Sequence, residues 1–216
     1  MKSYPKIQYF NKGIFGESFY AFDKLDGSNL RFEYSRKRGW YKFGTRNVMI
    51  DKNSEFFGDS IDIFLNKYAN DLEEIFRKEK QYRNAESFVV FGEYLGEHSF
   101  AGKHDSNDVK DVIIFDINQY KKGFIPSKQF IEDFGHLDIP KLIYQGEYDM
   151  DFINAVRNNV FDLKEGVVCK GVFKSKGLDQ IWMTKIKTYE WLEKVKLMYG
   201  EKYLIEELNG DITLFN

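Results

Sequence analysis

Cysteine, proline and long apolar runs are all scarce in this sequence of 216 residues. The single Cys169 excludes a disulfide framework and a cysteine-rich zinc site, and it favours a reducing, cytoplasmic setting. Three prolines exclude a proline-rich linker. Runs such as Val112–Phe115 are far too short to span a bilayer, and the N-terminal segment lacks the apolar stretch of a secretory signal. We therefore expect no membrane contact.

A large excess of charge of one sign is also missing. The net charge of −2 argues against nucleic-acid binding by bulk charge. Locally, however, Arg31–Arg46 holds six basic residues and one acid, and Lys170–Lys187 holds five lysines and one acid. These stretches are either solvated faces or sites that recognise an anion such as phosphate. Trp40 and Tyr41, in the first stretch, are either stacking residues for RNA or part of a strand core.

Hydrophobic and aromatic residues are plentiful, at 43% and 18%, and predict a globular chain with a substantial core. Hydrophobic periodicity predicts helices over 54–82, 127–134 and 149–158, and a final helix from Thr188 to Gly200. It predicts strands over 17–34 (broken by a turn at 26–29), 40–44, 87–95, 110–118, 164–173 and 180–187. We expect an α+β domain over residues 1–187 and a short helical tail over 188–216.

Lys24 is the first residue that points to chemistry. It ends an aromatic strand and is followed by the turn Asp26-Gly27. A half-buried lysine needs a reason because its charge is costly to desolvate, and one reason is that its amine is a nucleophile. The alternative is an ordinary lysine at a strand end.

Four further fragments bear on that choice. Two predicted strands end in an acid, in the fragments Phe91-Gly92-Glu93 and Val112–Asp116. Glu165 precedes the apolar Val167-Val168. Lys185 and Lys187 are two residues apart and therefore share one face of a strand. Together they supply a nucleophilic lysine, carboxylates suited to Mg²⁺, an aromatic for base stacking and a lysine pair for phosphates. That inventory fits attack on a nucleoside triphosphate.

The order of these motifs resembles the covalent nucleotidyltransferase superfamily of ATP-dependent ligases and RNA capping enzymes. The motifs are KLDGSN at 24–29, FGE at 91–93, VIIFDI at 112–117, KEGVV at 164–168 and KIK at 185–187. The chain is most similar to the RNA ligases typified by the phage double-strand-specific ligase and the trypanosome RNA-editing ligases. Asn29 stands where DNA ligases and capping enzymes usually carry arginine, and Thr45-Arg46-Asn47 resembles the next motif of these RNA ligases.

The resemblance implies a fold and a covalent chemistry. The expected fold is an α+β, ATP-grasp-like adenylylation core of antiparallel sheets flanked by helices, without an OB domain, because the residues after Lys187 are too few for one. Lys24 would attack the α-phosphorus of ATP and hold AMP as a phosphoramidate. Lys185 and Lys187 would neutralise the α-phosphate, orient the leaving pyrophosphate and lower the pKa of the Lys24 amine.

The resemblance also implies roles for residues around the nucleotide and its metal. Asp23 and Leu25 would lie near the adenine, Phe115 would stack on it, and Val168 would pack against its other face. Asn29 and Arg46 would contact the α-phosphate or the incoming 5′-phosphate. Glu93 would hold the ribose hydroxyl or water on the metal. Asp26 and Glu165 would organise hydrated Mg²⁺, or Mn²⁺ in its place.

The expected activity is that of an ATP-dependent RNA ligase active in RNA repair. It would join 3′-OH and 5′-phosphate ends of nicked or broken RNA, in the cytoplasm, or in the host cytoplasm if the chain is viral. Similar RNA ligases carry a further C-terminal domain, so a protein partner is expected to replace that surface. Two alternatives stay open: a minimal DNA ligase or GTP-using capping guanylyltransferase, and a non-catalytic module that binds nucleotide or RNA.

Overall fold

The chain forms two compact units, each built around one β-sheet. The structure is a computed structural model that describes residues 1–208 and 210–215. One unit comprises Met1–Pro5 and Asp26–Ile139, and the other comprises Lys6–Leu25 and Pro140–Asn216. Each unit is therefore assembled from separate segments of the chain, and the predicted division at residue 187 stays a prediction. Within the described residues, no helix is both long enough and apolar enough to cross a membrane.

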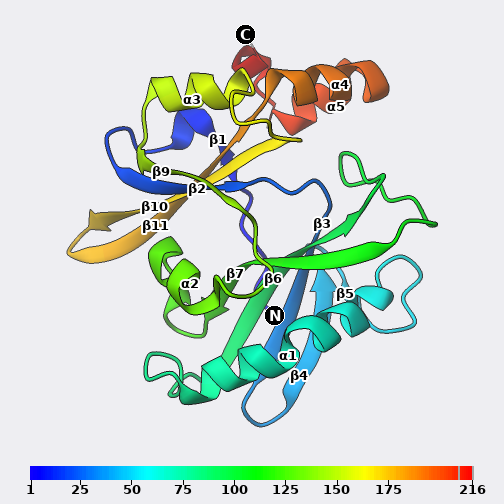
Figure 1. Cartoon of the computed structure of the whole chain (residues 1–216), viewed down its shortest axis with the longest axis vertical. Coiled ribbons are helices and arrows are strands. Elements are labelled where there is room, and N and C mark those ends of the chain that lie inside the picture. The colour runs from blue at the N-terminus through cyan, green and yellow to red at the C-terminus, as the bar shows by residue number, and fades with distance from the viewer. Residues whose placement is uncertain (209, 216) are drawn as a thin grey trace. The chain divides into compact units, whose positions relative to one another are not determined.

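The first unit contains an antiparallel sheet with the strand order β5-β4-β3-β6-β7-β8. Its strands are β3 (Ser28–Ser35), β4 (Gly39–Thr45), β5 (Met49–Ile50), β6 (Ser87–Gly96), β7 (Lys110–Gln119) and β8 (Gly123–Phe124). Two helices, α1 (Asp59–Lys78) and α2 (Ser127–Phe134), pack on one face of this sheet (Figure 1). The predictions of strands at 40–44, 87–95 and 110–118 and of the helix at 127–134 are confirmed.

Helix α1 supplies much of the core of the first unit. Its stripe of Phe64, Tyr68, Leu72 and Phe76 has the helical spacing expected of a core-facing side. The ring of Phe64 stacks on Phe32 of β3 with centroids 3.8 Å apart. Trp40 packs edge-on against Phe64 at 4.8 Å, so its strand-core interpretation is the correct one. The helix begins later than the predicted 54, because turns occupy the residues before Gly58.

Strand β7 contains a β-bulge at the aromatic residue of its motif. Phe91 pairs with Asp116 while Gly92 pairs with Ile114, which leaves Phe115 as the extra residue. A bulge of this kind reverses the alternation of side chains, so Phe115 and Asp116 both leave the α1 side of the sheet. The core-facing residues of β7 show the same shift, since they are the even-numbered Val112 and Ile114 before the bulge and the odd-numbered Ile117 after it.

The second unit contains a sheet with the strand order β1-β11-β10-β2-β9. Its strands are β1 (Gln8–Tyr9), β2 (Ser18–Asp23), β9 (Leu142–Glu147), β10 (Gly166–Ser175) and β11 (Leu178–Lys187). All neighbours are antiparallel except β1 and β11, which are parallel. The closing pair predicted at 164–173 and 180–187 is confirmed, since β10 and β11 pair from Gly166–Lys187 to Ser175–Leu178. Strand β9 was not predicted.

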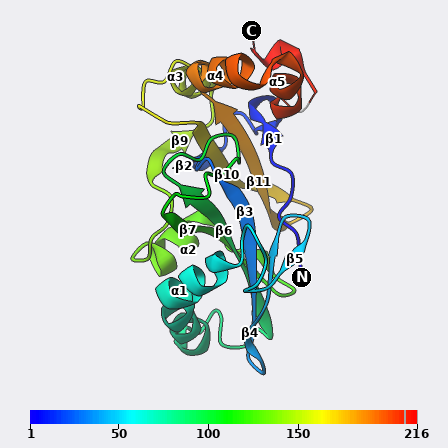
Figure 2. The ribbon, with the colours of Figure 1, turned by 90° about the vertical axis from the view of Figure 1, so that its right-hand side faces the viewer.

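Helices of the second unit include α3 (Met150–Arg157), α4 (Tyr189–Tyr199) and α5 (Glu201–Glu207), with short 3-10 turns at Phe10–Lys12 and Ile212–Phe215 (Figure 2). Thr188 caps α4 as predicted, because its hydroxyl accepts a hydrogen bond from the Trp191 N–H at 3.1 Å. Gly200, at φ +84°, ends that helix in a conformation that favours glycine. The helix predicted over 149–158 is confirmed as α3. The α+β class with antiparallel sheets and flanking helices is also as predicted.

Candidate active site

Lys24 directly follows β2, an interior strand of the sheet in the second unit. Its Nζ is 3.0 Å from Oε1 of Glu165, whose side chain is only 3% exposed. The backbone N–H of Lys24 donates to the carbonyl of Gly166 at 2.9 Å, so the lysine is fixed beside the start of β10. A Cβ at Gly166 would lie 2.1 Å from the carbonyl oxygen of Ile186. Only glycine allows this approach, which sets the position of Glu165 just before it.

Glu165 bridges two ammonium groups. The same Oε1 that contacts Lys24 is 2.7 Å from Nζ of Lys187, whose side chain is 2% exposed. Burial alone would raise the pKa of the Glu165 carboxyl, but the Lys187 and Lys24 charges outweigh it and lower that pKa. The carboxylate is therefore ionised, and it holds the two amines on either side of one oxygen. The ammonium of Lys187 also lies over the Trp191 ring, 3.6 Å from its centroid.

Glu207, from helix α5, is a residue of this cluster that sequence reasoning missed. Its carboxylate accepts a hydrogen bond from Lys187, and its backbone carbonyl accepts one from Nζ of Lys185 at 3.3 Å. Burial would raise the pKa of the Glu207 carboxyl, but the Lys187 charge outweighs burial and lowers it. No motif marks Glu207, which in the sequence is one of several acids in the tail.

The amine of Lys185 has a strongly lowered pKa. Burial first, and then the Lys187 and Lys24 charges, lower its pKa from 10.5 to about 7, although the Glu207 and Glu165 carboxylates offset part of the shift. The Nζ of Lys185 also lies 5.1 Å from the centre of the Tyr9 ring.

This perturbation predicts a pH dependence of anion binding. The positive charge on Lys185 is present below its pKa and is lost as the pH rises through about 7. We expect the affinity for inorganic pyrophosphate, relative to that of Lys185→Arg, to fall by up to about tenfold for each pH unit above that value, because the guanidinium stays charged. Calorimetric titrations of both proteins measure this ratio, in which the ionisation of pyrophosphate itself cancels. A ratio that does not change with pH contradicts the prediction.

The predicted neighbours of the nucleophile lie close to it in the same unit. Asp23 ends β2 opposite Val167, and burial followed by the Glu165 charge raises its pKa. Leu25 is half-buried, and the chain leaves this unit after it. Val168 is half-buried on β10 and pairs directly with Lys185. The structure thus brings Lys24, Glu165, Lys185 and Lys187 together with these residues, and their chemical roles stay predictions.

In the first unit, another group of predicted residues shares the sheet face opposite α1. Asn29 on β3 and Glu93 on β6 are direct cross-strand partners. The side-chain oxygen of Asn29 is buried without a hydrogen-bond partner among the described residues, so it can accept from a ligand. Phe115 reaches the same face through its bulge. Arg46 is exposed in the connection from β4 to β5. The opposing faces proposed for Phe115 and Val168 belong to different units and stay a prediction.

Tyr4 is a second residue that the sequence did not indicate. Its ring is 5.0 Å from the rings of both Phe91 and Phe115, and its hydroxyl donates to the Asp116 carboxylate. Burial, and then the Asp116 charge, raise the pKa of Tyr4 well above its usual value. The phenol therefore stays protonated and holds Phe115 at the edge of the bulge. Asp116 does stand in a motif, but Tyr4 stands far from all of them.

The turn after the nucleophile is fixed by a loop of the first unit. The Asp26 carboxylate, 6% exposed, accepts the backbone N–H groups of Ala101 and Gly102 at 3.0 and 3.2 Å. The hydroxyl of Ser28 lies 2.7 Å from Nε2 of His104. Asp26 thus has a structural task in this turn, and its metal role stays a prediction.

Within either unit, the described residues contain no cluster of three or more His, Cys, Asp or Glu side chains that could hold a metal ion. Mg²⁺ does not need such a cluster, because it is usually held by one or two carboxylates together with phosphates and water. Of the predicted ligands, Asp26 and Glu165 have short contacts with donor groups. Glu93 lies half-buried on the sheet face beside Asn29, and its metal role stays a prediction too.

Comparison of the sequence with family models identifies the family of the chain. A model of the family described as RNA ligase matches residues 17–187, which include every motif from Lys24 to Lys187. The chain belongs to the RNA ligase family. The resemblance predicted from the motifs is therefore confirmed. No curated protein sequence matches this RNA ligase family member.

Solved structures of an RNA ligase from Naegleria gruberi share the fold. A ligand-free mutant has a TM-score of 0.64 at 18% identity over 89% of this chain and 57% of that one. A mutant with ATP and Mn has a TM-score of 0.61 at 19% identity, covering 89% of this chain and 58% of that one. A complex with pyrophosphate has a TM-score of 0.63 at 17% identity, covering 91% and 58%. This family member thus spans less than two thirds of the length of those ligases.

Proposed function

We propose that this RNA ligase family member is an ATP-dependent RNA ligase that works through lysyl-AMP and an adenylylated RNA. The observation that carries the proposal is the contact of the Lys24 amine with Glu165, which also binds Lys187, with Lys185 two residues away on the same strand. A lysine held beside a cation pair suits attack on a triphosphate. The N. gruberi RNA ligase structures that contain ATP with Mn, or pyrophosphate, support this choice of nucleotide.

In the first step, the Lys24 nitrogen attacks the α-phosphorus of ATP. A nitrogen–phosphorus bond forms, the bond to the bridging oxygen breaks, and its electron pair leaves with pyrophosphate. An ammonium has no lone pair, so Lys24 must first give up a proton, and the Glu165 oxygen at 3.0 Å is the acceptor that the site offers. Lys185 and Lys187 neutralise charge on the phosphate oxygens and on the leaving group.

The two later steps use the bound AMP as an activating group. An oxygen of the RNA 5′-phosphate attacks the AMP phosphorus and releases Lys24. The RNA 3′-hydroxyl then attacks the activated 5′-phosphorus, forms the new phosphodiester bond and releases AMP. Mg²⁺ or Mn²⁺ would neutralise the triphosphate, and Glu93, with Asp26 and Glu165, would hold it or its waters. Asn29 and Arg46 would orient the phosphates.

Covalent labelling tests the proposed function directly. The protein is incubated with Mg²⁺ and ATP labelled at the α-phosphate, and then with a nick that carries a 5′-phosphate in an RNA or a DNA duplex. We expect one AMP on the protein and its transfer to RNA. Labelling by GTP would instead favour a capping guanylyltransferase, and transfer to DNA alone would favour a DNA ligase. Reversible ATP binding without a covalent product would favour a non-catalytic module.

The RNA ends and a protein partner are further parts of the proposal. We propose nicked or broken RNA with 3′-OH and 5′-phosphate ends as the substrate. A partner that supplies more RNA-binding surface would raise sealing and leave AMP attachment to the protein unchanged. Measuring the two steps separately, with and without the partner, tests this part.

We expect the affinity for pyrophosphate to rise when the charge of Glu207 is removed. Its carboxylate binds Lys187, which the proposed mechanism needs for phosphate. Glu207→Gln keeps the size of the side chain and frees the lysine charge, so we expect pyrophosphate to bind roughly five- to tenfold more tightly. Isothermal titration measures the affinity, and Glu206→Gln on the same helix is the matched control. Weaker binding in Glu207→Gln would instead mean that the carboxylate positions Lys187 for its ligand.

A further inference from the structure

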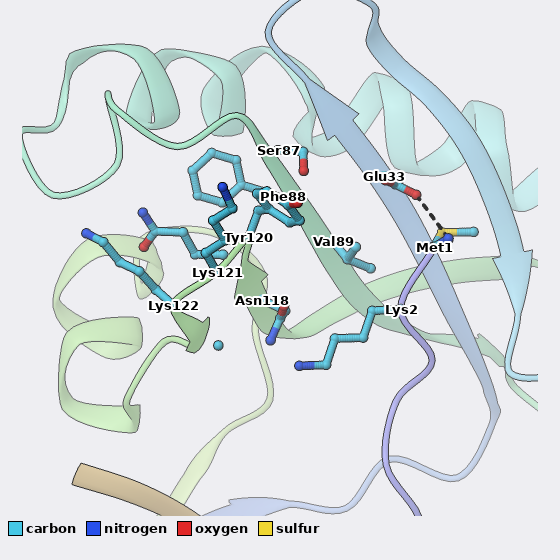
Figure 3. Close-up of a pocket in the computed structure, with 12 residues that line it drawn as sticks. Met1, Lys2, Glu33, Ser87, Phe88, Val89, Asn118, Tyr120, Lys121 and Lys122 are labelled. Carbon is cyan, nitrogen blue, oxygen red and sulfur yellow. Dashed lines mark ion pairs between the residues drawn. The ribbon is translucent and has the colours of Figure 1, made fainter. Parts of the chain in front are cut away.

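A pocket in the first unit carries positive charge that the proposed chemistry does not use. The pocket lies where β6 begins and β7 ends (Figure 3). Its volume is about 640 Å³. That volume lies in the range of sites for nucleotide-sized ligands. Its polar lining includes Lys2 from the N-terminal segment, Asn118 of β7, and Tyr120, Lys121 and Lys122 from the turn between β7 and β8.

The charge of this pocket is strongly unbalanced. Three lysines line it, and its single acid, Glu33, already lies 3.6 Å from the N-terminal amine. Among the described residues, no carboxylate lies within ion-pair distance of Lys2, Lys121 or Lys122. The Lys122 amine donates instead to the Gln81 carbonyl at 3.3 Å, and the Lys2 amine lies 4.8 Å from the centre of the Phe124 ring. These amines are held in place and still lack an anion.

The turn that presents two of the lysines has an unusual backbone. Lys121 adopts φ +65°, in the left-handed region where glycine and asparagine are favoured over lysine. Beside it, Tyr120 exposes 49% of its surface, and the Lys121 amine lies 5.3 Å from the centre of its ring. A lysine in a costly conformation next to an exposed aromatic suits contact with a phosphate and a base.

The pocket lies on the same strand as Glu93. Ser87, Val89 and Glu93 of β6 have the same side-chain parity, so all three belong to the sheet face opposite α1. At about 3.3 Å per residue, Ser87 is roughly 20 Å along the strand from Glu93. That span corresponds to roughly six nucleotides at the ~3.4 Å rise of a B-form strand, and to slightly more in the A-form of an RNA helix, where the rise is smaller.

We propose that this pocket binds the phosphate backbone of the RNA substrate, about six nucleotides from the ends that are joined. The proposal rests on the proposed function, because it takes Glu93 as a marker of the adenylylation site. The pocket would contribute to RNA affinity and to no other step of the reaction. Attachment of AMP to Lys24 needs no RNA and does not depend on it.

Lys121→Asn is the sharpest test of the proposal. It removes one charge and places at φ +65° a residue that this conformation favours, so the fold should not suffer. We expect a three- to tenfold loss of affinity for 5′-phosphorylated RNA and a salt slope (log K against log salt) about one unit shallower. Fluorescence anisotropy at several salt concentrations measures both, and self-adenylylation measured in parallel should be unchanged.

Lys176→Asn is the matched control, because Lys176 also has a positive φ, +51°, in the turn between β10 and β11 of the second unit. An unchanged RNA affinity in Lys121→Asn overturns the proposal. An equal loss in both variants also overturns it, since bulk charge would then explain the effect. RNA that extends only three nucleotides from the nick should bind the wild type and Lys121→Asn alike, and a persisting difference counts against the site. If the wild type does not take up AMP, the proposed function is rejected instead. The RNA affinities of the variants can still be compared in that case, because they are measured separately.

Discussion

Replacing Lys24 with alanine is expected to abolish covalent AMP attachment, with a fall in labelling of about 10⁴-fold or more. Lys24 supplies the nucleophile of the first step of the proposed mechanism, the attack on ATP. The other amine that contacts Glu165 belongs to Lys187, which also binds Glu207 and is 2% exposed. A second lysine should therefore not replace Lys24. Mass spectrometry after incubation with ATP and Mg²⁺ measures the attachment.

Lys164→Ala is the matched control for this loss. Lys164 is exposed and stands next to Glu165 in the sequence. Its replacement tests whether the loss of any lysine charge near the site reduces labelling. We expect this variant to be labelled like the wild type. Lys24→Ala should still bind ATP reversibly, because Lys185 and Lys187 stay in place. AMP found on another lysine of Lys24→Ala would show that the nucleophile has been misidentified.

Removing the Glu165 carboxylate is expected to cost both stability and activity. Glu165→Ala leaves the Lys24 and Lys187 charges without their shared partner in a buried place, and such losses typically cost about 3–5 kcal/mol. Urea unfolding measures this loss. AMP attachment should fall as well, since the Lys24 amine loses the oxygen that orients it. Glu193→Ala, at an exposed site on α4, should change stability by no more than about 0.5 kcal/mol.

The pH dependence of that stability loss follows from the lowered pKa of the Glu165 carboxyl. A carboxyl with a lower pKa in the folded state adds stability at pH values above its ordinary pKa. That contribution is lost as the pH falls through the folded-state pKa. The difference between the wild type and Glu165→Ala should therefore narrow in acid. A constant difference across the acid range would contradict the ionised bridge between the two lysines.

Much of the fold could be predicted because its strands and helices have clear periodicity. The pair β10 and β11, the helix α2 and the cap at Thr188 follow from local patterns that long-range contacts do not override. Strand β9 could not be predicted in this way. It lies at the edge of its sheet, its residues are half-buried or exposed, and it therefore lacks the alternation of a strand with one buried face.

The candidate site could be predicted only where motifs mark it. Lys24, Glu165, Lys185 and Lys187 stand in motifs, and the structure brings all four together. Glu207 and Tyr4 stand outside the motifs, and their importance comes from contacts with residues that lie elsewhere in the sequence. Local sequence patterns do not show which distant charges or rings meet, so these two residues could be found only from the structure.

The place of β2 inside its sheet, with a neighbour on each side, has a consequence for how the protein folds during synthesis. Strand β2 lies between β10 and β9, and both of these are synthesised long after it. While the ribosome is still making the first half of the chain, the segment that ends in Lys24 has neither neighbour to pair with. The nucleophile therefore gains its fixed position, and its contact with Glu165, only late in translation. Under the proposed mechanism, a nascent chain that still lacks β9 and β10 should therefore not take up AMP.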